Sequence, residues 1–160
     1  MKNNEHNKKT NSVPASETAG NPFADAPVIF SYTRAQAIED GVLVDLTEWA
    51  KETGFKIPVA CTSEVWHRYI TPPAGTRELG QSERGRAHDV LWMLFVAIRG
   101  QSTPRPASNG RPAHAANDLL FYEVIFLQDP KRHETVKLKG HCGPGDHGEP
   151  VLTIMLPNED

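Results

Sequence analysis

Residues 87–98, AHDVLWMLFVAI, carry the strongest helical pattern in the chain and decide its fold. Six apolar residues recur at the spacing of one helix face, and they are Ala87, Val90, Leu91, Leu94, Phe95 and Ile98. We therefore expect a helix from about Glu83 to Arg99 at the centre of the core. Further apolar residues at Trp92, Met93 and Val96 require cover on more than one side, from a sheet and from either small helices or another subunit.

Three strands are expected after this helix. Leu119–Leu127, LLFYEVIFL, is aromatic and β-branched with one acidic residue, which is typical of a strand covered on both faces. Glu134–Gly140, ETVKLKG, alternates apolar residues with Lys137 and Lys139, which we expect to point outward. Val151–Leu156, VLTIML, is the third. Short connections predict an antiparallel meander of three strands packed on the long helix, in an α+β fold.

Several short helices and short strands are expected before the long helix. Each helix begins at a residue that can cap it and ends at glycine or proline: Ser31 or Thr33 to Gly41, Thr47 to Gly54, and Thr62 or Ser63 to Pro72 and Pro73. Residues 42–46, VLVDL, and residues 56–61, KIPVAC, have the composition of short strands.

Two polar segments set the expected domain limits. Residues 1–25 contain few apolar side chains to offset the entropy of ordering them, so we predict a disordered tail before a single domain over residues 26–160. Residues 100–117 are rich in proline and glycine and predict a mobile loop. The basic residues Arg99, Arg105 and Arg111 in or beside it could contact an anionic partner, although a solvated linker is the simpler interpretation.

Composition restricts the function. The chain of 160 residues has a formal net charge of −3, which argues against a nucleic-acid footprint and against a DNA mimic. Its longest apolar run, Val90–Ile98, is about half of the ~20 residues that a membrane span needs, so we expect no membrane association. Cys61 and Cys142 have no CxxC spacing, and we expect two free thiols in the cytoplasm. The sequence has none of the common glycine-rich motifs that bind nucleotide phosphates, and we therefore expect no cofactor.

The segment HCGPGDHGEP, residues 141–150, concentrates groups that could ligate a metal such as zinc. The candidate ligands are His141, Cys142, Asp146, His147 and Glu149. Their spacing matches no common zinc motif, and the glycines suit a tight connection between the second and third strands, which we favour. An anion-binding nest of backbone N–H groups is a weaker alternative. As a rigid projection, the loop is the expected partner-contacting surface, through His141, Asp146, His147 and Glu149.

Nucleophilic catalysis would need one of the two thiols beside a base. The possible bases are His67, His88, His141 and His147. No local signature supports any of these pairs, and Cys61 within a short apolar strand is more simply a small core residue. His88 and Asp89 could form an orienting pair at the start of the long helix, but solvated surface residues are the simpler interpretation.

The blocks at residues 28–66, VIFSYTRAQAIEDGVLVDLTEWAKETGFKIPVACTSEVW, and residues 142–160, CGPGDHGEPVLTIMLPNED, resemble an uncharacterised family of small bacterial proteins. That family is carried by conjugative plasmids, integrative elements and phages, and the similarity extends over about residues 28–99 and 118–160. The resemblance implies an accessory protein of a mobile genetic element that acts inside a bacterial cell. It supplies no catalytic residue.

Two classes of function compete. In the first, the protein binds a macromolecule of the host or of the element, for counter-defence or regulation. A protein partner is favoured, a nucleic acid stays open, and a homodimer is compatible with the excess apolar surface of the long helix. In the second class, the protein is a small metal- or cysteine-dependent hydrolase that uses the loop His141–Glu149.

Overall fold

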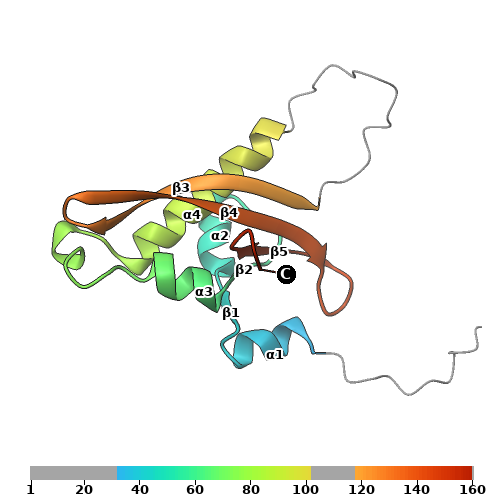
Figure 1. Ribbon diagram of the computed structural model, residues 1–160. Helices are drawn as coiled ribbons and strands as arrows, with labels where there is room; N and C mark the ends of the chain where they lie inside the picture. The colour runs from blue at the N-terminus through green and yellow to red at the C-terminus, as the bar shows by residue number, and fades with distance from the viewer. Residues whose placement is uncertain (1–31, 102–117, 160) are drawn as a thin grey trace, which may run out of the picture. The chain divides into compact units, whose positions relative to one another are not determined.

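A five-stranded mixed sheet and one long helix, α4 (Glu83–Gln101), form the α+β fold of the computed structural model (Figure 1). The structure describes residues 32–101 and 118–159. The strands are β1 (Leu43–Asp45), β2 (Val59–Thr62), β3 (Leu119–Asp129), β4 (Arg132–Pro144) and β5 (Pro150–Met155). The shorter helices are α1 (Arg34–Glu39), α2 (Thr47–Thr53), α3 (Ser63–Val65), a π-helical turn (Trp66–Ile70) and a 3₁₀ turn (Arg77–Leu79).

Some predictions concern residues outside the described part of the chain. They are the disordered tail of residues 1–25, nearly all of the loop 100–117 with Arg105 and Arg111, and a cap at Ser31. The first two residues of the predicted loop, Gly100 and Gln101, belong to α4. Within the described residues, no helix combines the length and the hydropathy needed to cross a membrane.

The predicted three-stranded meander is part of a larger sheet. Strands β3, β4 and β5 pair antiparallel in sequence, as expected. The two short strands then extend the sheet, because β2 pairs parallel with β5 and β1 pairs antiparallel with β2. The order is β1-β2-β5-β4-β3, so the predicted meander is confirmed as three strands of a five-stranded sheet, and the sheet extends beyond it through the two short strands. Strand composition indicates that β1 and β2 exist, but it does not indicate which strand they join.

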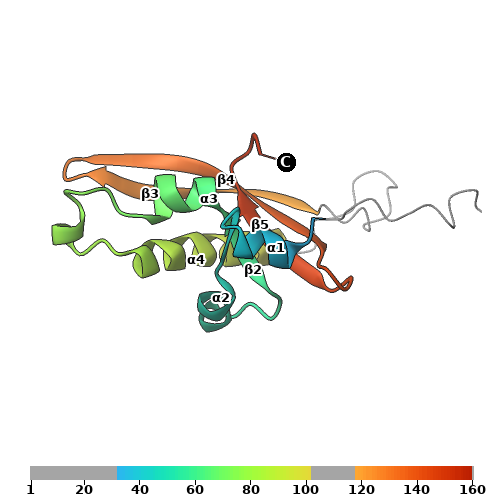
Figure 2. The same ribbon diagram turned by 90° about the horizontal axis from the view of Figure 1, so that it is seen from below.

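Helix α4 is the centre of the core, as its spacing predicts. Ala87, Val90, Leu91 and Leu94 are fully buried, and the helix packs against β3. Figures 1 and 2 show α4 running along the hairpin of β3 and β4. Close approach depends on Gly140 of β4, because a Cβ atom there would lie 2.9 Å from Leu94 Cδ1. The helix and the sheet therefore meet where one strand has no side chain.

The prediction that β3 is covered on both faces was wrong. Tyr122, Val124 and Phe126 are buried against the core, whereas the residues between them are exposed. The strand is nevertheless apolar on both faces, so its composition hides the alternation that a half-exposed strand usually shows. In β4, Lys137 is exposed as expected but Lys139 is buried, and its ammonium group donates a hydrogen bond to the carbonyl oxygen of Glu159.

Most predicted helix boundaries are confirmed. Thr33 caps α1 in a capping box, and Thr62 caps α3. Gly41 and Gly54 have φ of 73° and 111°, the left-handed conformation that ends a helix without strain only at glycine. Thr47 was expected to cap α2 but is its first residue.

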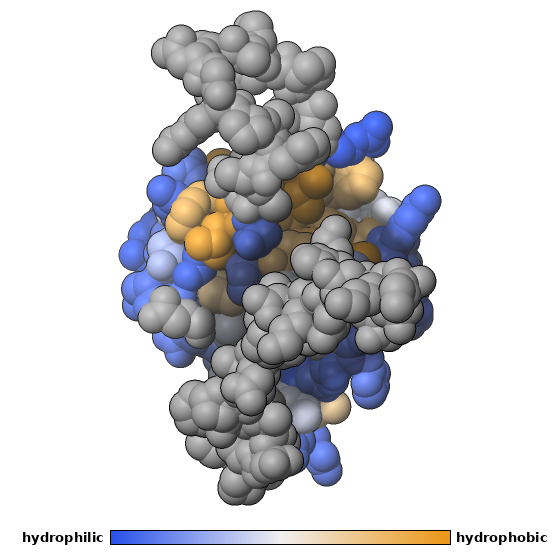
Figure 3. Space-filling model, turned by 90° about the vertical axis from the view of Figure 1, so that its right-hand side faces the viewer, coloured by the Kyte–Doolittle hydropathy of each residue, from blue (hydrophilic) through white to orange (hydrophobic). Residues whose placement is uncertain are grey.

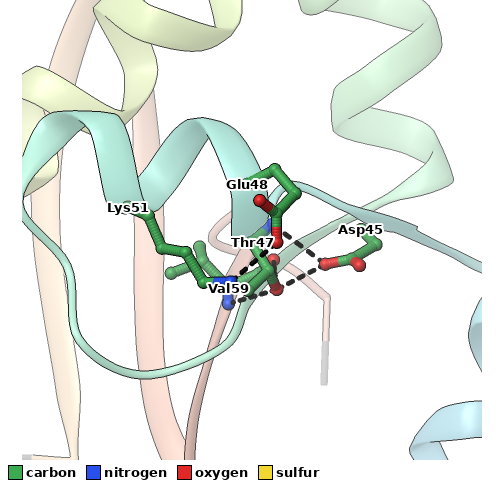
Figure 4. A network of polar contacts seen from close by, with 5 residues as sticks. All are labelled: Asp45, Thr47, Glu48, Lys51 and Val59. Atoms are coloured by element: carbon green, nitrogen blue, oxygen red, sulfur yellow. Dashed lines mark hydrogen bonds and ion pairs between the residues drawn. The ribbon is translucent and has the colours of Figure 1, made fainter.

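The carboxylate of Asp45 supports the start of α2 instead of a cap by Thr47 (Figure 4). Asp45 accepts hydrogen bonds from the backbone N–H and the hydroxyl of Thr47, at 2.9 and 2.5 Å. The Thr47 hydroxyl oxygen in turn accepts from the N–H of Val59 at 3.3 Å, and this contact ties α2 to β2. Lys51 and Glu48 form an exposed ion pair on the same helix.

Candidate interaction surface

The predicted loop at residues 141–149 is shorter than expected. Residues His141–Pro144 belong to β4, and only residues 145–149 connect β4 to β5. Gly145 N–H donates to the carbonyl of Glu149 at 2.6 Å, and Gly148 N–H donates to the carbonyl of Gly145 at 3.0 Å. Gly148 has a φ of 83°, as a tight connection requires. The segment is therefore a hairpin turn, which is the interpretation that the glycines favoured.

The acidic side chains of this turn have partners within the chain. Asp146 accepts hydrogen bonds from the backbone N–H groups of Arg34 and Ala35, at 2.7 and 3.0 Å, in the first turn of α1. These two bonds lower the pKa of the Asp146 carboxyl group. Glu149 accepts from the N–H of His147 at 2.9 Å. The turn thus holds the N-terminus of α1 against the sheet.

The five candidate metal ligands do not converge. His141 and Cys142 are neighbours on a strand, so their side chains point to opposite faces of the sheet. Among residues 32–101 and 118–159, no group of three or more His, Cys, Asp or Glu side chains could hold a metal ion. The contact of His141, Asp146, His147 and Glu149 with a partner stays a prediction.

The thiols and histidines considered for catalysis are also separated. Burial of Cys61 raises the pKa of its thiol from 9.0 to about 12, so the thiol is protonated at neutral pH. Cys142 is exposed on β4, and both cysteines are free. His67 Nδ1 lies 2.7 Å from the carbonyl oxygen of Ser63, whereas His88 stacks on Trp92.

An apolar surface extends from the exposed side of α4 around the edge strand β3 to the face of the sheet opposite α4, and we call it the α4–β3 surface. Its residues are large, hydrophobic and exposed: Trp92 (48%), Met93 (39%) and Val96 (45%) on α4, and Leu119 (44%), Phe121 (47%) and Ile125 (64%) on β3. Figure 3 shows hydrophobic residues gathered into a patch with hydrophilic residues around it. Monomers rarely expose contiguous apolar patches of more than a few hundred Å².

A groove joins the helix and the strand within this surface. It has a volume of about 500 Å³, and Trp92 and Met93 line it from α4 while Glu123 and Ile125 line it from β3. Asp89 adds a carboxylate at the helix side. The groove shows that the two halves of the α4–β3 surface are continuous at this point.

Strand β3 is also an edge of the sheet. Among the described residues it pairs only with β4, whose Cys142 N–H donates to the carbonyl of Asp118 at 2.7 Å. Backbone bonding alternates along an antiparallel pair, so the even-numbered residues of β3 bond to β4. The N–H and C=O groups of Leu119, Phe121, Glu123 and Ile125 therefore point away from β4, along the open edge.

Charged groups lie around the apolar residues. Lys137 Nζ is 4.9 Å from the centre of the Phe121 ring, and Arg99 Cζ is 5.4 Å from the centre of the Phe95 ring. Asp89 and Arg99 are exposed on α4 on either side of the stripe that Trp92, Met93 and Val96 form. The stripe thus has an acidic end and a basic end.

Sequence reasoning identified the excess apolar residues on α4 but not those on β3. It predicted that β3 is covered on both faces, although its position as the first strand of the meander could have indicated an edge. The apolar sequence of β3 therefore did not indicate that one face of this strand is exposed and forms half of the α4–β3 surface.

Comparison of the sequence with known protein families identifies the family of the chain. The chain belongs to DUF6573, a family of unknown function, which matches residues 19–160. This match includes residues 19–27 and 100–117, which lie outside the resemblance over about residues 28–99 and 118–160. Comparison with curated proteins and with solved structures finds no match.

Proposed function

We propose that the protein works by binding another macromolecule through the α4–β3 surface. The observation that carries this proposal is the set of six large hydrophobic side chains that remain exposed on one helix and one adjacent edge strand. Burial of apolar area on binding is favourable by about 25 cal/mol per Å² before the costs of association are subtracted. An apolar groove with an open strand edge beside it offers both apolar area and backbone hydrogen bonds to a partner.

A protein is a better fit to this surface than a nucleic acid. Phosphate recognition depends on clustered lysine and arginine side chains. The charges around the α4–β3 surface are mixed, with Asp89 and Glu123 beside Lys137 and Arg99. The apolar residues at the centre suit a protein interface, in which charged residues are depleted from the core of the contact.

The resemblance supports a narrower version of the proposal. In it the protein is an accessory factor of a bacterial mobile genetic element, and its partner belongs to the host or to the element. A role in counter-defence or in regulation is consistent with a chain that acts by binding. The alternative, a metal- or cysteine-dependent hydrolase, has no specific observation in its favour among the described residues, since the Cys61 thiol is buried and has a raised pKa.

Affinity capture with matched variants tests the proposal. Ile125→Lys places a charge in the α4–β3 surface, whereas Leu79→Lys makes the same change at an exposed residue outside it (64% and 53% exposed). We expect the wild-type chain and Leu79→Lys to capture the same proteins from bacterial cells, and Ile125→Lys to lose at least one of them. Thermal unfolding followed by circular dichroism checks that both variants are folded. Capture of an unchanged set by Ile125→Lys would contradict the proposal.

A further inference from the structure

We infer that the partner on the α4–β3 surface is a second copy of this chain, paired through β3 about a two-fold axis. This inference rests on the proposed function, because it names the occupant of the same surface. In the dimer, β3 of each copy pairs antiparallel with β3 of the other, so one sheet continues through both copies. The two α4 helices, one from each copy, then lie on the same face of this sheet.

The edge of β3 is suited to pairing with itself. A two-fold axis perpendicular to a sheet relates two edge strands in the antiparallel direction. The residues whose backbone groups point outward are also those with exposed side chains, namely Leu119, Phe121, Glu123 and Ile125. Glu123 is the only charged residue in this row.

The position of Glu123 restricts the register of the pair. Outward-pointing residues must face each other, so the axis can pass through Tyr122, Glu123 or Val124 near the strand centre. An axis at Glu123 would place two carboxylates opposite each other, which is unfavourable. An axis at Tyr122 or Val124 places Glu123 opposite Phe121 or Ile125 instead.

The charges of α4 are complementary under the same symmetry. Because α4 packs against β3, the two helices are neighbours across the axis and run antiparallel. Asp89 and Arg99 lie on either side of the stripe of Trp92, Met93 and Val96. Antiparallel helices centred on this stripe bring Asp89 of each copy toward Arg99 of the other. A separate peptide strand could fill the β3 edge but would leave this stripe and its charged ends uncovered.

The second copy covers the apolar stripe of α4. Trp92, Met93 and Val96, each roughly half exposed, lie between the two helices. Leu119, Phe121 and Ile125 lie on the face of the sheet opposite α4, where each gains a cross-strand neighbour from the second copy.

Sedimentation of the full chain, from low micromolar to several hundred micromolar, gives the first test. We expect the mass of two chains at high concentration. Glu123→Pro removes an edge N–H that does not bond to β4, and proline is tolerated at such positions, so it should block pairing without unfolding the sheet. Glu123→Ala keeps that N–H and is the matched control. Ile125→Lys should weaken the dimer at least about 30-fold, whereas Leu79→Lys should not.

Charge reversal on α4 tests the antiparallel arrangement of the helices. Asp89→Arg places two arginines together at both symmetry-related contacts, and Arg99→Asp places two aspartates together there. We expect each single variant to dimerise about 10-fold more weakly than the wild type, in keeping with exposed charge pairs. An equimolar mixture of the two variants restores opposite charges at both contacts, so it should form a heterodimer with nearly wild-type affinity. No partner other than a second copy predicts this rescue.

The outcomes separate this inference from the proposed function. A mass of one chain at every concentration overturns the dimer, and loss of captured proteins by Ile125→Lys would then still support a different protein on the same surface. A dimer that tolerates Glu123→Pro and Ile125→Lys uses another face, which also overturns the inference. A mixture of charge variants that stays as weak as either variant alone overturns the arrangement of the helices.

Discussion

The β4–β5 turn and the α4–β3 surface are both exposed, but their groups differ in what they already contact. In the turn, the carboxylates of Asp146 and Glu149 accept hydrogen bonds from N–H groups of the same chain. On the surface, Phe121 and Ile125 remain exposed after the core has formed. The comparison shows that residue types alone suggest a possible ligand. Whether a side chain can bind that ligand depends on whether the fold already supplies its contacts.

The largest effect is expected beneath the surface, on the inner side of α4. Leu94→Ala should destabilise the fold by about 2–5 kcal/mol, because a fully buried leucine loses its contacts and leaves a cavity. Urea unfolding followed by circular dichroism measures this change. A nearly neutral result would mean that Leu94 is not packed in the core, and that the inner side of α4 contributes no more to stability than its exposed side.

A smaller effect is expected from filling the β4–β5 turn. Gly145→Val should destabilise the fold by about 1–3 kcal/mol, the usual cost of overpacking. A Cβ atom there would meet the Glu149 carboxylate and would lie 2.9 Å from Val151 Cγ1. Gly75→Val is the control, since a Cβ atom at Gly75 meets nothing within 4 Å. Equal melting temperatures for the two variants would show that the turn is not packed.

Removal of the charge at Asp146 should have a pH-dependent effect. The pKa of Asp146 is lowered by hydrogen bonds to α1, so its carboxylate stabilises the fold above its ordinary pKa of 3.8 and loses this contribution as the pH falls through the lowered value. Asp146→Asn should therefore lower the melting temperature at pH 7, and the difference from the wild type should shrink below pH 3.8. A difference that is constant with pH would contradict the role of the charge.

The smallest effect on stability is expected on the α4–β3 surface itself. Ile125→Thr keeps a β-branched side chain at an exposed position, so the free energy of unfolding should change by about 0.5 kcal/mol or less at concentrations where the chain is monomeric. The same variant should weaken the dimer in sedimentation. A large loss of stability in the monomer would mean that Ile125 belongs to the fold and not to the interface.

The sequence predicts the parts of this fold that depend on local patterns. The spacing of Val90, Leu91 and Leu94 indicates the central helix, and the glycines at 41 and 54 mark helix ends because their φ is positive. The pairing of β2 with β5 could not be predicted, since Val59 and Leu152 are far apart in the chain and neither segment specifies its neighbour. Parallel and antiparallel pairs differ in hydrogen bonding, which side-chain types do not report.

The candidate site was predictable only in part. Trp92, Met93 and Val96 exceed what one helix face can bury, which indicates an exposed stripe. The open side of β3 required knowledge of the strand order, because Phe121 and Ile125 have the same residue types as the core. The carboxylate of Asp146 looked available for a ligand, and only the position of Arg34 and Ala35 showed that it caps a helix.

The place of β5 between β2 and β4 has a consequence for synthesis of the chain. Strand β5 follows the other four strands of the sheet in the chain, yet among the described residues it is the strand that joins β1 and β2 to the hairpin of β3 and β4. Until it is made, β2 and β4 each present an unpaired edge, and such long-range pairings form slowly. During synthesis the edges of β2 and β4 therefore stay unpaired, and prone to aggregation, until the six residues of β5 complete the sheet.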